Sequence, residues 1–254
     1  MKILAIDTSG QQAGAAIVDE YITIGEIMIN AQSGPKSWHH SEILMPAIER
    51  LFALCGHTLE DIDYVAYTSG PGSFTGLRIG AATALGLARS INKPAVAVPT
   101  LDALAYNMLG MAVLEKGSLT ECSNMIVPLM DARRGQVYAA LYSIGQNSKF
   151  SRLTDYLASS VEDVLERVGE LDTSAIFLGD GADAYKPAIL DRLPKARFAH
   201  ANSNRQRPAS VGLCAIHQLQ SAAIPGLTQD TPQLIYIRDP QAVRSKAAGP
   251  IKQP

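Results

Sequence analysis

The segment most informative about the fold is Gly70-Pro71-Gly72-Ser73-Phe74-Thr75-Gly76-Leu77-Arg78-Ile79-Gly80. A short apolar strand, Tyr64 to Tyr67, precedes it, and the Gly-Pro-Gly turn leads into a helix that we expect from Thr75 to Ser90. The hydroxyl of Ser73 or of Thr75 can cap this helix by accepting a hydrogen bond from a free backbone amide. A buried strand, a tight turn and a capped helix in this order predict an α/β protein.

The helix after the turn is apolar nearly all round. Gly76, Gly80 and Ala84 recur at every fourth position, so they lie on one face and allow another backbone to approach closely. A helix with so few polar side chains is buried on more than one side. One side should meet the sheet, and the other should meet a second helix of this chain or of a partner.

The rest of the chain repeats one arrangement. Each of two apolar hairpins has a first strand that ends near an aspartate, Asp7 in one and Asp131 in the other. Helices and further short strands follow each hairpin. Hairpins mixed with strand–helix units predict mixed sheets with flanking helices, in two duplicated lobes. The expected strands are Lys2–Ile6, Gly14–Val18, Tyr21–Ile29, Tyr64–Tyr67, Pro94–Val98, Met125–Met130, Val137–Tyr142 and Ile176–Leu178. The expected helices are Ser37–Cys55, Thr75–Ser90, Leu101–Leu114, Glu162–Val168 and Pro208–Ala223.

Composition narrows the function classes. Of 254 residues, 47% are hydrophobic and 18% are charged, which leaves neutral surface for a partner. The net charge of −2 argues against a domain that grips nucleic acid alone, since such domains are basic. The longest apolar stretch, Ile79 to Ala88, is half a membrane span at most. Three separated cysteines indicate free thiols, and we expect a cytoplasmic protein.

Three glycine-containing turns are candidate nucleotide-binding elements. Asp7-Thr8-Ser9 in the first turn could face a metal ion and phosphate, and the turn from Gly70 through Gly72 precedes a helix N-terminus, which favours anions. The turn from Gly179 to Gly181 could face a ribose or an adenine. Each is also ordinary turn chemistry, so weak ATP or ADP binding and a purely structural role both remain open.

No catalytic or metal-binding set is evident in the sequence. The five histidines include no pair spaced four apart on a helix, and Gly-x-Ser-x-Gly is absent. Arg197, Arg205 and Arg207 with His200 form a modest basic cluster, which we interpret as a solvated loop.

Four phrases in this order resemble the bacterial TsaB (YeaZ) family, a branch of the glycoprotease-like ASKHA proteins. They are the segments 3–9, 40–46, 69–80 and 131–138, that is ILAIDTS, HSEILMP, SGPGSFTGLRIG and DARRGQVY. The likeness covers residues 1 to 145 strongly and continues weakly through Gly179–Gly181 and Tyr236–Arg238.

The resemblance implies a two-lobed, actin-like fold and a role in making N6-threonylcarbamoyladenosine at position 37 of tRNAs that read codons beginning with A. It implies a TsaD-like subunit that carries out the threonylcarbamoyl transfer and a TsaE-like ATPase that joins the pair. The family member is regarded as a scaffold, so tRNA is met only through the complex, and no membrane is involved.

One replacement supports a non-catalytic role. The catalytic relative carries a metal-binding His-x-x-x-His pair after the strand that corresponds to Pro94–Val98, and here Thr100 and Leu104 stand at those positions. Leu104 has no lone pair to donate, Thr100 is a poor neutral ligand, and Asp102 alone cannot replace two imidazoles. We therefore expect neither a metal site nor catalytic residues.

The resemblance also implies that subunits pair through the first two helices. The expected interface residues are Leu44, Ala47, Ile48, Leu51, Arg78, Ala82 and Leu85. The alternative is that all of them are internal core. If they are exposed, the chain alone should form a homodimer, and Leu85→Glu should weaken association with the partner.

Residues 1–107 should form the first lobe with the partner-binding helices, residues 108–238 the second lobe, and residues 239–254 a tail. The helix at 208–224 could pack back on the first lobe. Two rival functions remain, an active nucleotide-dependent kinase or ATPase of the same fold and, more remotely, a metallopeptidase.

Overall fold

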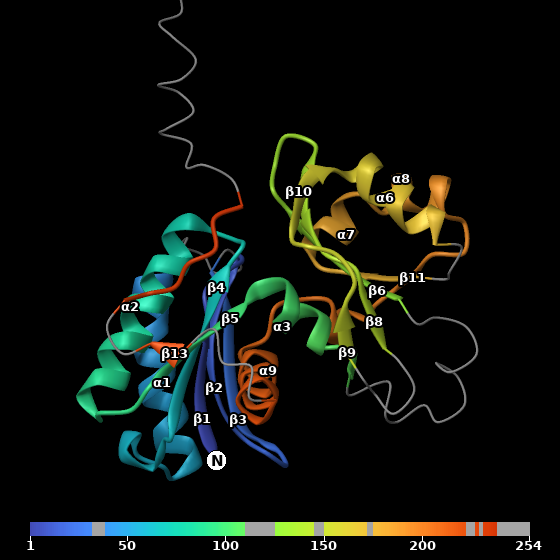
Figure 1. Ribbon diagram of the computed structural model, residues 1–254. Coiled ribbons are helices and arrows are strands. Elements are labelled where there is room, and N and C mark those ends of the chain that lie inside the picture. The colour runs from blue at the N-terminus through green and yellow to red at the C-terminus, as the bar shows by residue number, and fades with distance from the viewer. Residues whose placement is uncertain are drawn as a thin grey trace, which may run out of the picture.

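The computed structural model describes residues 1–31, 39–109, 125–144, 150–171, 175–221, 227–228 and 231–237. These residues form two lobes, each built on one sheet with helices against it (Figure 1). The first sheet has the strand order β13-β5-β4-β1-β2-β3. Its strands are β1 Lys2–Asp7, β2 Gln12–Asp19, β3 Thr23–Asn30, β4 Tyr64–Gly70, β5 Ala95–Pro99 and β13 Leu227–Thr228.

The second sheet follows the order β10-β7-β6-β11-β12, with β8 paired to β6 and β9 paired to β8. Its strands are β6 Met125–Asp131, β7 Gln136–Ala139, β8 Tyr142–Ile144, β9 Phe150–Arg152, β10 Leu157–Ser160, β11 Ala175–Leu178 and β12 Arg197–Phe198. The helices among the described residues are α1 His40–Cys55, α2 Phe74–Ser90, α3 Thr100–Tyr106, α6 Val161–Glu170, α7 Asp180–Ala184, α8 Lys186–Arg192 and α9 Pro208–Gln220. Two short 3₁₀ turns, η1 Leu59–Asp61 and η3 Ala201–Ser203, complete the described elements.

The two sheets share one plan. In the first lobe β3, β2 and β1 are antiparallel and β4 and β5 continue the sheet in parallel; in the second lobe β10, β7 and β6 are antiparallel, and β11 and β12 are parallel. β1 and β6 are therefore equivalent strands, and each ends in an aspartate, Asp7 and Asp131. The predicted fold class, α/β with two lobes that each hold a mixed sheet, is confirmed.

Strand alternation divides the core of the first lobe between the two faces of its sheet. Leu4 and Ile6 of β1 pack with α1 and α2, whereas Ile3 and Ala5 pack with α3 and α9. Successive strand residues point to opposite faces, and helices cover both faces, so β1 is apolar at nearly every position. Asp7 continues the odd-numbered series and is directed toward the face that α9 covers.

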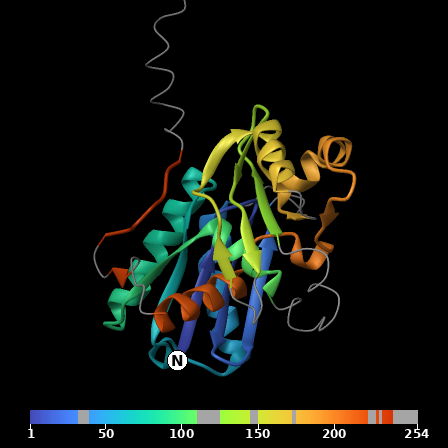
Figure 2. The ribbon, with the colours of Figure 1, turned by 45° about the vertical axis from the view of Figure 1, so that its right-hand side comes forward.

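The last described part of the chain returns to the first lobe. α9 contributes Val211, Ala215 and their neighbours to the core beneath β1 and β2, and β13 pairs with β5. Residues 231–237 then cross the ends of β4 and α2, so the red segment lies beside the teal helix in both views (Figures 1 and 2). The structure places α9, β13 and residues 231–237 on the first lobe, as considered for the helix at 208–224, so the expected extension of the second lobe to residue 238 needs correction.

The sequence predicted most long elements within a few residues. In the first lobe, the helix expected over Leu101–Leu114 is shorter, because α3 ends at Tyr106, and β13 was not predicted. The other departures lie in the second lobe. The single strand expected over Val137–Tyr142 is two strands, because the backbone leaves β7 at Ala139 and re-enters a sheet as β8. β9 and β10 were not predicted, since each is only three or four residues long. The ends of three expected helices, at Ser37, Leu114 and Ala223, and the tail from 239 lie outside the described residues.

Candidate functional site

The turn after β1 is a packed junction between β1 and the start of α2. Asp7, Thr8 and Ser9 are all buried. The Thr8 hydroxyl donates to the carbonyl of Gly76 at 2.8 Å, and the amide of Ser73 donates to the carbonyl of Ser9 at 2.7 Å. These bonds hold the N-terminus of α2 directly against the turn, so the hydroxyl of Thr8 is already engaged within the protein.

Asp7 has an unusual electrostatic environment. Its Oδ1 accepts hydrogen bonds from the amide and the hydroxyl of Ser9, at 2.8 and 2.7 Å, and from Thr68 at 3.4 Å. Its Oδ2 is buried without a hydrogen-bond partner among the described residues. Burial raises the pKa of Asp7 to about 6, and the hydrogen bonds from Ser9 and Thr68 offset part of that rise.

The glycines of the Gly-Pro-Gly segment are required by close packing. A Cβ on Gly72 would lie 2.4 Å from the carbonyl oxygen of Ser9, and a Cβ on Gly76 would lie 2.1 Å from that of Thr8. Gly70 has φ of +110°, and a Cβ there would lie 2.5 Å from the carbonyl oxygen of Ile235. A side chain at any of these three positions would clash with the backbone, whereas phosphate binding by this turn stays a prediction.

The equivalent turn of the second lobe is also closely packed. Gly179, with φ of +104°, approaches the carbonyl oxygen of Leu129 so closely that a Cβ would lie 2.1 Å from it, and Gly181 lies against the same carbonyl group. The amide of Gly179 donates to Asn204 Oδ1 at 2.8 Å. Burial raises the pKa of Asp180, whose Oδ1 accepts from the amides of Asp131 and Gly181. A side chain at either position would therefore clash with the backbone of β6.

Thr100 and Leu104 lie inside the molecule, on α3, where the two lobes meet. Both are fully buried, and Leu104 belongs to an apolar cluster with residues of β6 and β11. Asp102 on the same helix accepts hydrogen bonds from Tyr142 at 2.5 Å and Tyr156 at 3.0 Å. Burial raises the pKa of Asp102, and these hydrogen bonds oppose the rise. Within the described part of the chain, no three His, Cys, Asp or Glu side chains are grouped to hold a metal ion.

The expected interface residues of α1 are core residues. Leu44, Ala47, Ile48 and Leu51 have exposed fractions of 1, 4, 2 and 2%, and all four face the first lobe. The assignment of these four side chains to a docking surface therefore needs correction. The wide apolar arc of α1 is used within the lobe, because α1 contacts β2, β3 and α2.

The expected interface residues of α2 are placed differently. Arg78 and Ala82 are exposed, whereas Leu85 is half-buried and packs against the first-lobe core. The guanidinium of Arg78 lies 3.8 Å from the centre of the Phe74 ring, and its Nε donates to the hydroxyl of Tyr236 at 3.2 Å. The two rings are 5.4 Å apart and both are partly exposed. We call Phe74, Arg78, Ala82 and Tyr236 the α2 patch.

Tyr236 was not predicted as a site residue. It lies 158 positions from Arg78 in the sequence, and only the weak family likeness at Tyr236–Arg238 drew attention to it. Tyr236 belongs to the segment 231–237, which two hydrogen bonds hold against β4. The amide of Ile235 donates to the carbonyl of Ser69 at 2.7 Å, and the amide of Gln233 donates to the Tyr67 hydroxyl at 3.0 Å.

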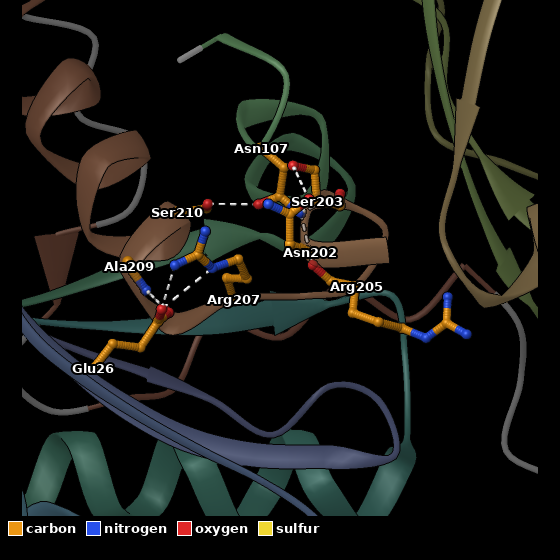
Figure 3. Close-up of polar contacts among 8 residues, drawn as sticks. All are labelled: Glu26, Asn107, Asn202, Ser203, Arg205, Arg207, Ala209 and Ser210. Carbon is orange, nitrogen blue, oxygen red and sulfur yellow. Dashed lines mark hydrogen bonds and ion pairs between the residues drawn. The ribbon is translucent and has the colours of Figure 1, made fainter. Parts of the chain in front are cut away.

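The supposed basic loop is part of a polar network between the lobes. Glu26 of β3 accepts from Arg207 Nε at 3.2 Å and from the amide of Ala209, at the start of α9, at 2.9 Å (Figure 3). Asn107 donates to the carbonyl oxygens of Ser203 and Arg205, and Arg205 pairs with Asp183 at 2.6 Å. Arg205 and Arg207 thus hold the segment that links the lobes, which corrects their interpretation as a solvated cluster.

The turn between β6 and β7 carries two arginines in an uncommon backbone conformation. Arg133 and Arg134 have φ of 62° and 58°, and Gly135 follows with 72°. The amide of Gln136 donates to the carbonyl of Arg133 at 3.2 Å, which closes the turn. Both arginines are exposed, and this hairpin is the yellow-green tip at the top of the second lobe in Figure 1.

None of the described helices has the length and apolar character needed to cross a membrane.

Comparison with known proteins identifies the family. The family model of TsaD, tRNA N6-adenosine threonylcarbamoyltransferase, matches residues 34–246. The tRNA threonylcarbamoyladenosine biosynthesis protein TsaB of Bacillus subtilis is 32% identical over 91% of this chain and 93% of its own length. TsaB of Escherichia coli is 30% identical over 73% of this chain and 74% of its own.

Solved structures agree on the fold. YeaZ from Pseudomonas aeruginosa superimposes with a TM-score of 0.70 at 20% identity, covering 93% of this chain and 99% of that one. The fold, the motifs and the length of the matches lead to one conclusion: the chain belongs to the TsaB (YeaZ) family of tRNA threonylcarbamoyladenosine biosynthesis proteins, a branch of the family that the transferase model describes.

Proposed function

We propose that this protein is a non-catalytic partner subunit that enables a TsaD-like transferase to attach threonylcarbamoyl to N6 of adenosine 37 in tRNAs reading codons that begin with A. A TsaE-like ATPase joins the pair, and the work takes place in the cytoplasm. The observation that carries the non-catalytic role is the position of Leu104. Where the resemblance puts an imidazole that holds the transferase's metal, an apolar side chain is fully buried in the core between the lobes.

The α2 patch supports docking of a partner. Aromatic and arginine side chains are enriched among the residues that dominate binding energy at interfaces, and here Arg78 is already held over the Phe74 ring and by a hydrogen bond to the Tyr236 hydroxyl. A side chain fixed before binding loses less conformational entropy when a partner covers it. Ala82 lies one turn further along α2 and is exposed, so a partner helix can approach closely there.

The first experiment tests the process. Depletion of the protein in its own cells should lower N6-threonylcarbamoyladenosine in total tRNA, as measured by mass spectrometry of digested nucleosides, and the full chain supplied in trans should restore it. Unchanged levels of the modified nucleoside after depletion contradict the proposal.

The second experiment tests the docking surface. Ala82→Glu places a charge on an exposed position that an interface would bury unpaired, so affinity for the TsaD-like subunit should fall at least ten-fold, which corresponds to about 1.4 kcal/mol. Leu85 is less suitable than the sequence suggested, because its half-buried side chain also supports the fold. Affinity is measured by titration calorimetry with both full-length subunits.

Ala188→Glu is the matched control. Ala188 is an exposed alanine on α8 in the second lobe, so the same substitution there should leave affinity unchanged. Equal affinities for the wild-type chain and Ala82→Glu would show that the partner binds elsewhere. The proposal also holds that the chain alone forms a homodimer through the α2 patch, so Ala82→Glu should convert a dimer to a monomer in light scattering.

The proposal includes, at most, weak binding of ATP or ADP by this subunit. The closely packed turns at Thr8–Ser9 and Gly179–Gly181 support a vestigial site rather than an active kinase. Calorimetry with ATP and Mg²⁺ on the chain alone distinguishes the two, since turnover by the lone protein supports the kinase alternative.

A further inference from the structure

The β6–β7 turn holds arginine where the backbone favours other residues. The hydrogen bond from the Gln136 amide to the Arg133 carbonyl and the positive φ angles of Arg134 and Gly135 make it a type I′ turn. Its two central residues need positive φ, a conformation that Asn, Asp and Gly adopt most readily. Arg134 takes the place usually given to Asn, and Arg133 before it is also left-handed. Two non-glycine residues therefore carry conformational strain, which gathers at functional positions.

The guanidinium groups of Arg133 and Arg134 form no ion pair within the described part of the protein. Arg152 lies 3.7 Å from Asp102, Arg205 pairs with Asp183, and Arg207 pairs with Glu26. Arg133 and Arg134, in contrast, make no side-chain hydrogen bond or ion pair with a described residue, and both are exposed. The turn thus carries two consecutive exposed arginines, neither of which has an ion-pair partner among the described residues.

The turn is anchored from below. Asp131 Oδ1 accepts from the amide of Arg133 at 2.8 Å, and Asp180 Oδ1 accepts from the amide of Asp131 at 3.1 Å. The amide of Ala132 donates to the carbonyl of Gln136 at 2.9 Å. The carboxylates are occupied with backbone amides, so they support the hairpin and leave both arginine side chains to the solvent.

We propose that Arg133 and Arg134 bind phosphate groups of the tRNA when the subunit is assembled with its transferase partner. This inference rests on the proposed function. A guanidinium matches the geometry of phosphate oxygens and keeps its charge at all physiological pH values. The chain as a whole has a net charge of −2, so it has no general attraction for RNA, and two local contacts add to the grip of the complex without making the lone subunit an RNA-binding protein.

The test compares complexes of the full-length chain and its partner, with an unmodified tRNA transcript that reads a codon beginning with A as the probe. The double variant Arg133→Asn with Arg134→Asn removes both charges and places in the turn a residue that tolerates positive φ. We expect the complex with this variant to bind the transcript about ten-fold more weakly. The plot of log K against log salt should become shallower by about 1.4 to 1.8, as for two lost phosphate contacts.

Folding and charge are controlled separately. The double Asn variant should melt at the same temperature as the wild-type chain or higher, because strain in the turn is relieved. Arg133→Lys with Arg134→Lys keeps the charge and should retain the salt dependence. Arg167→Gln with Arg192→Gln removes two exposed charges from α6 and α8 of the same lobe and should leave tRNA affinity unchanged.

Each result decides the inference. If the complex with the double Asn variant assembles and binds the transcript with wild-type affinity, the inference is overturned. It is overturned as well if the variant loses the partner subunit, because the arginines would then belong to a protein interface. Failure of the wild-type chain to bind its partner contradicts the proposed function itself, which is a separate outcome.

Discussion

At the scale of single residues, Asp7 shows how burial changes chemistry that the sequence alone suggests. An Asp-Thr-Ser turn reads as a potential ligand for a metal ion and phosphate, yet here it lies beneath the start of α2, with one carboxylate oxygen bonded and the other unpartnered among the described residues. The sequence predicted Asp7 as a candidate residue of a nucleotide-binding turn. It could not predict burial, because the residues that cover the turn are more than sixty positions away.

Asp7 makes stability depend on pH. Burial raises its pKa from 3.8 to about 6, so between these values the folded chain binds more protons than the unfolded chain. The free energy of unfolding therefore falls as pH rises through this window, and the loss is complete above about pH 6. Asp7→Asn removes the buried charge and should stabilise the protein at pH 7 by up to about 3 kcal/mol, at 1.36 kcal/mol per pKa unit.

The difference between Asp7→Asn and the wild-type chain should be largest at pH 7 and should shrink as the pH falls toward 4, where the folded-state carboxyl is protonated and the unfolded-state carboxyl, with its pKa of 3.8, is partly protonated. Urea unfolding at pH 4, 5, 6 and 7 measures this difference. Parallel stability profiles for the two proteins would mean that Asp7 titrates normally.

At the scale of elements, α2 was the best-predicted part of the molecule. Ser73 caps it by accepting from the amide of Gly76 at 3.2 Å, as expected, and the row of small residues at 76, 80 and 84 does allow a close approach. What approaches is the β1 turn of the same lobe. A single sequence shows that a helix face is packed, but it does not show whether the neighbour belongs to the same chain, and for this reason the α1 residues were misassigned.

Two glycines of α2 provide a matched pair for testing this packing. Gly76→Ala would bring a Cβ to 2.1 Å from the Thr8 carbonyl oxygen, whereas nothing lies within 4 Å of a Cβ on Gly86. We expect Gly76→Ala to destabilise the chain by about 1–3 kcal/mol through overpacking. Gly86→Ala should stabilise it by roughly 0.5–1 kcal/mol, because alanine has the higher helix propensity. Chemical denaturation of both variants gives the answer, and equal effects would contradict the close contact.

At the scale of the whole molecule, the lobes are joined by a short segment whose polar contacts come from three distant parts of the chain. Glu26 reaches it from β3, Asn107 from the end of α3, and Asp183 from α7 (Figure 3 shows the first two). The pattern of hairpins and helices was enough to predict two lobes. The network was not predictable, since its members are separated by up to 183 positions and carry no common motif.

Glu26→Gln tests this junction. The carboxylate accepts from the Arg207 guanidinium and also from the backbone amide of Ala209. That amide lies in the first turn of α9, so it has no acceptor within the helix. Hydrogen bonds to charged groups contribute about 1.5–3 kcal/mol each, so the variant should lose about 2 kcal/mol or more. The amides of the first turn of α9 should then exchange with deuterium faster.

Arg205→Gln is the comparison for the junction. It breaks an ion pair whose two side chains are 37 and 47% exposed, and such pairs contribute at most about 1 kcal/mol. A loss as large as that of Glu26→Gln would mean that the whole segment, rather than the contact with β3, holds the lobes together.

The return of the chain to its starting lobe has a consequence for synthesis. β5 receives its neighbour β13, and β1 and β2 receive the cover of α9, only from residues beyond 207. A nascent polypeptide that has emerged as far as α3 therefore still exposes one apolar face of its first sheet. The second lobe is continuous in the sequence, so it can be completed earlier. The half of the molecule that leaves the ribosome first should be the last to reach its native state.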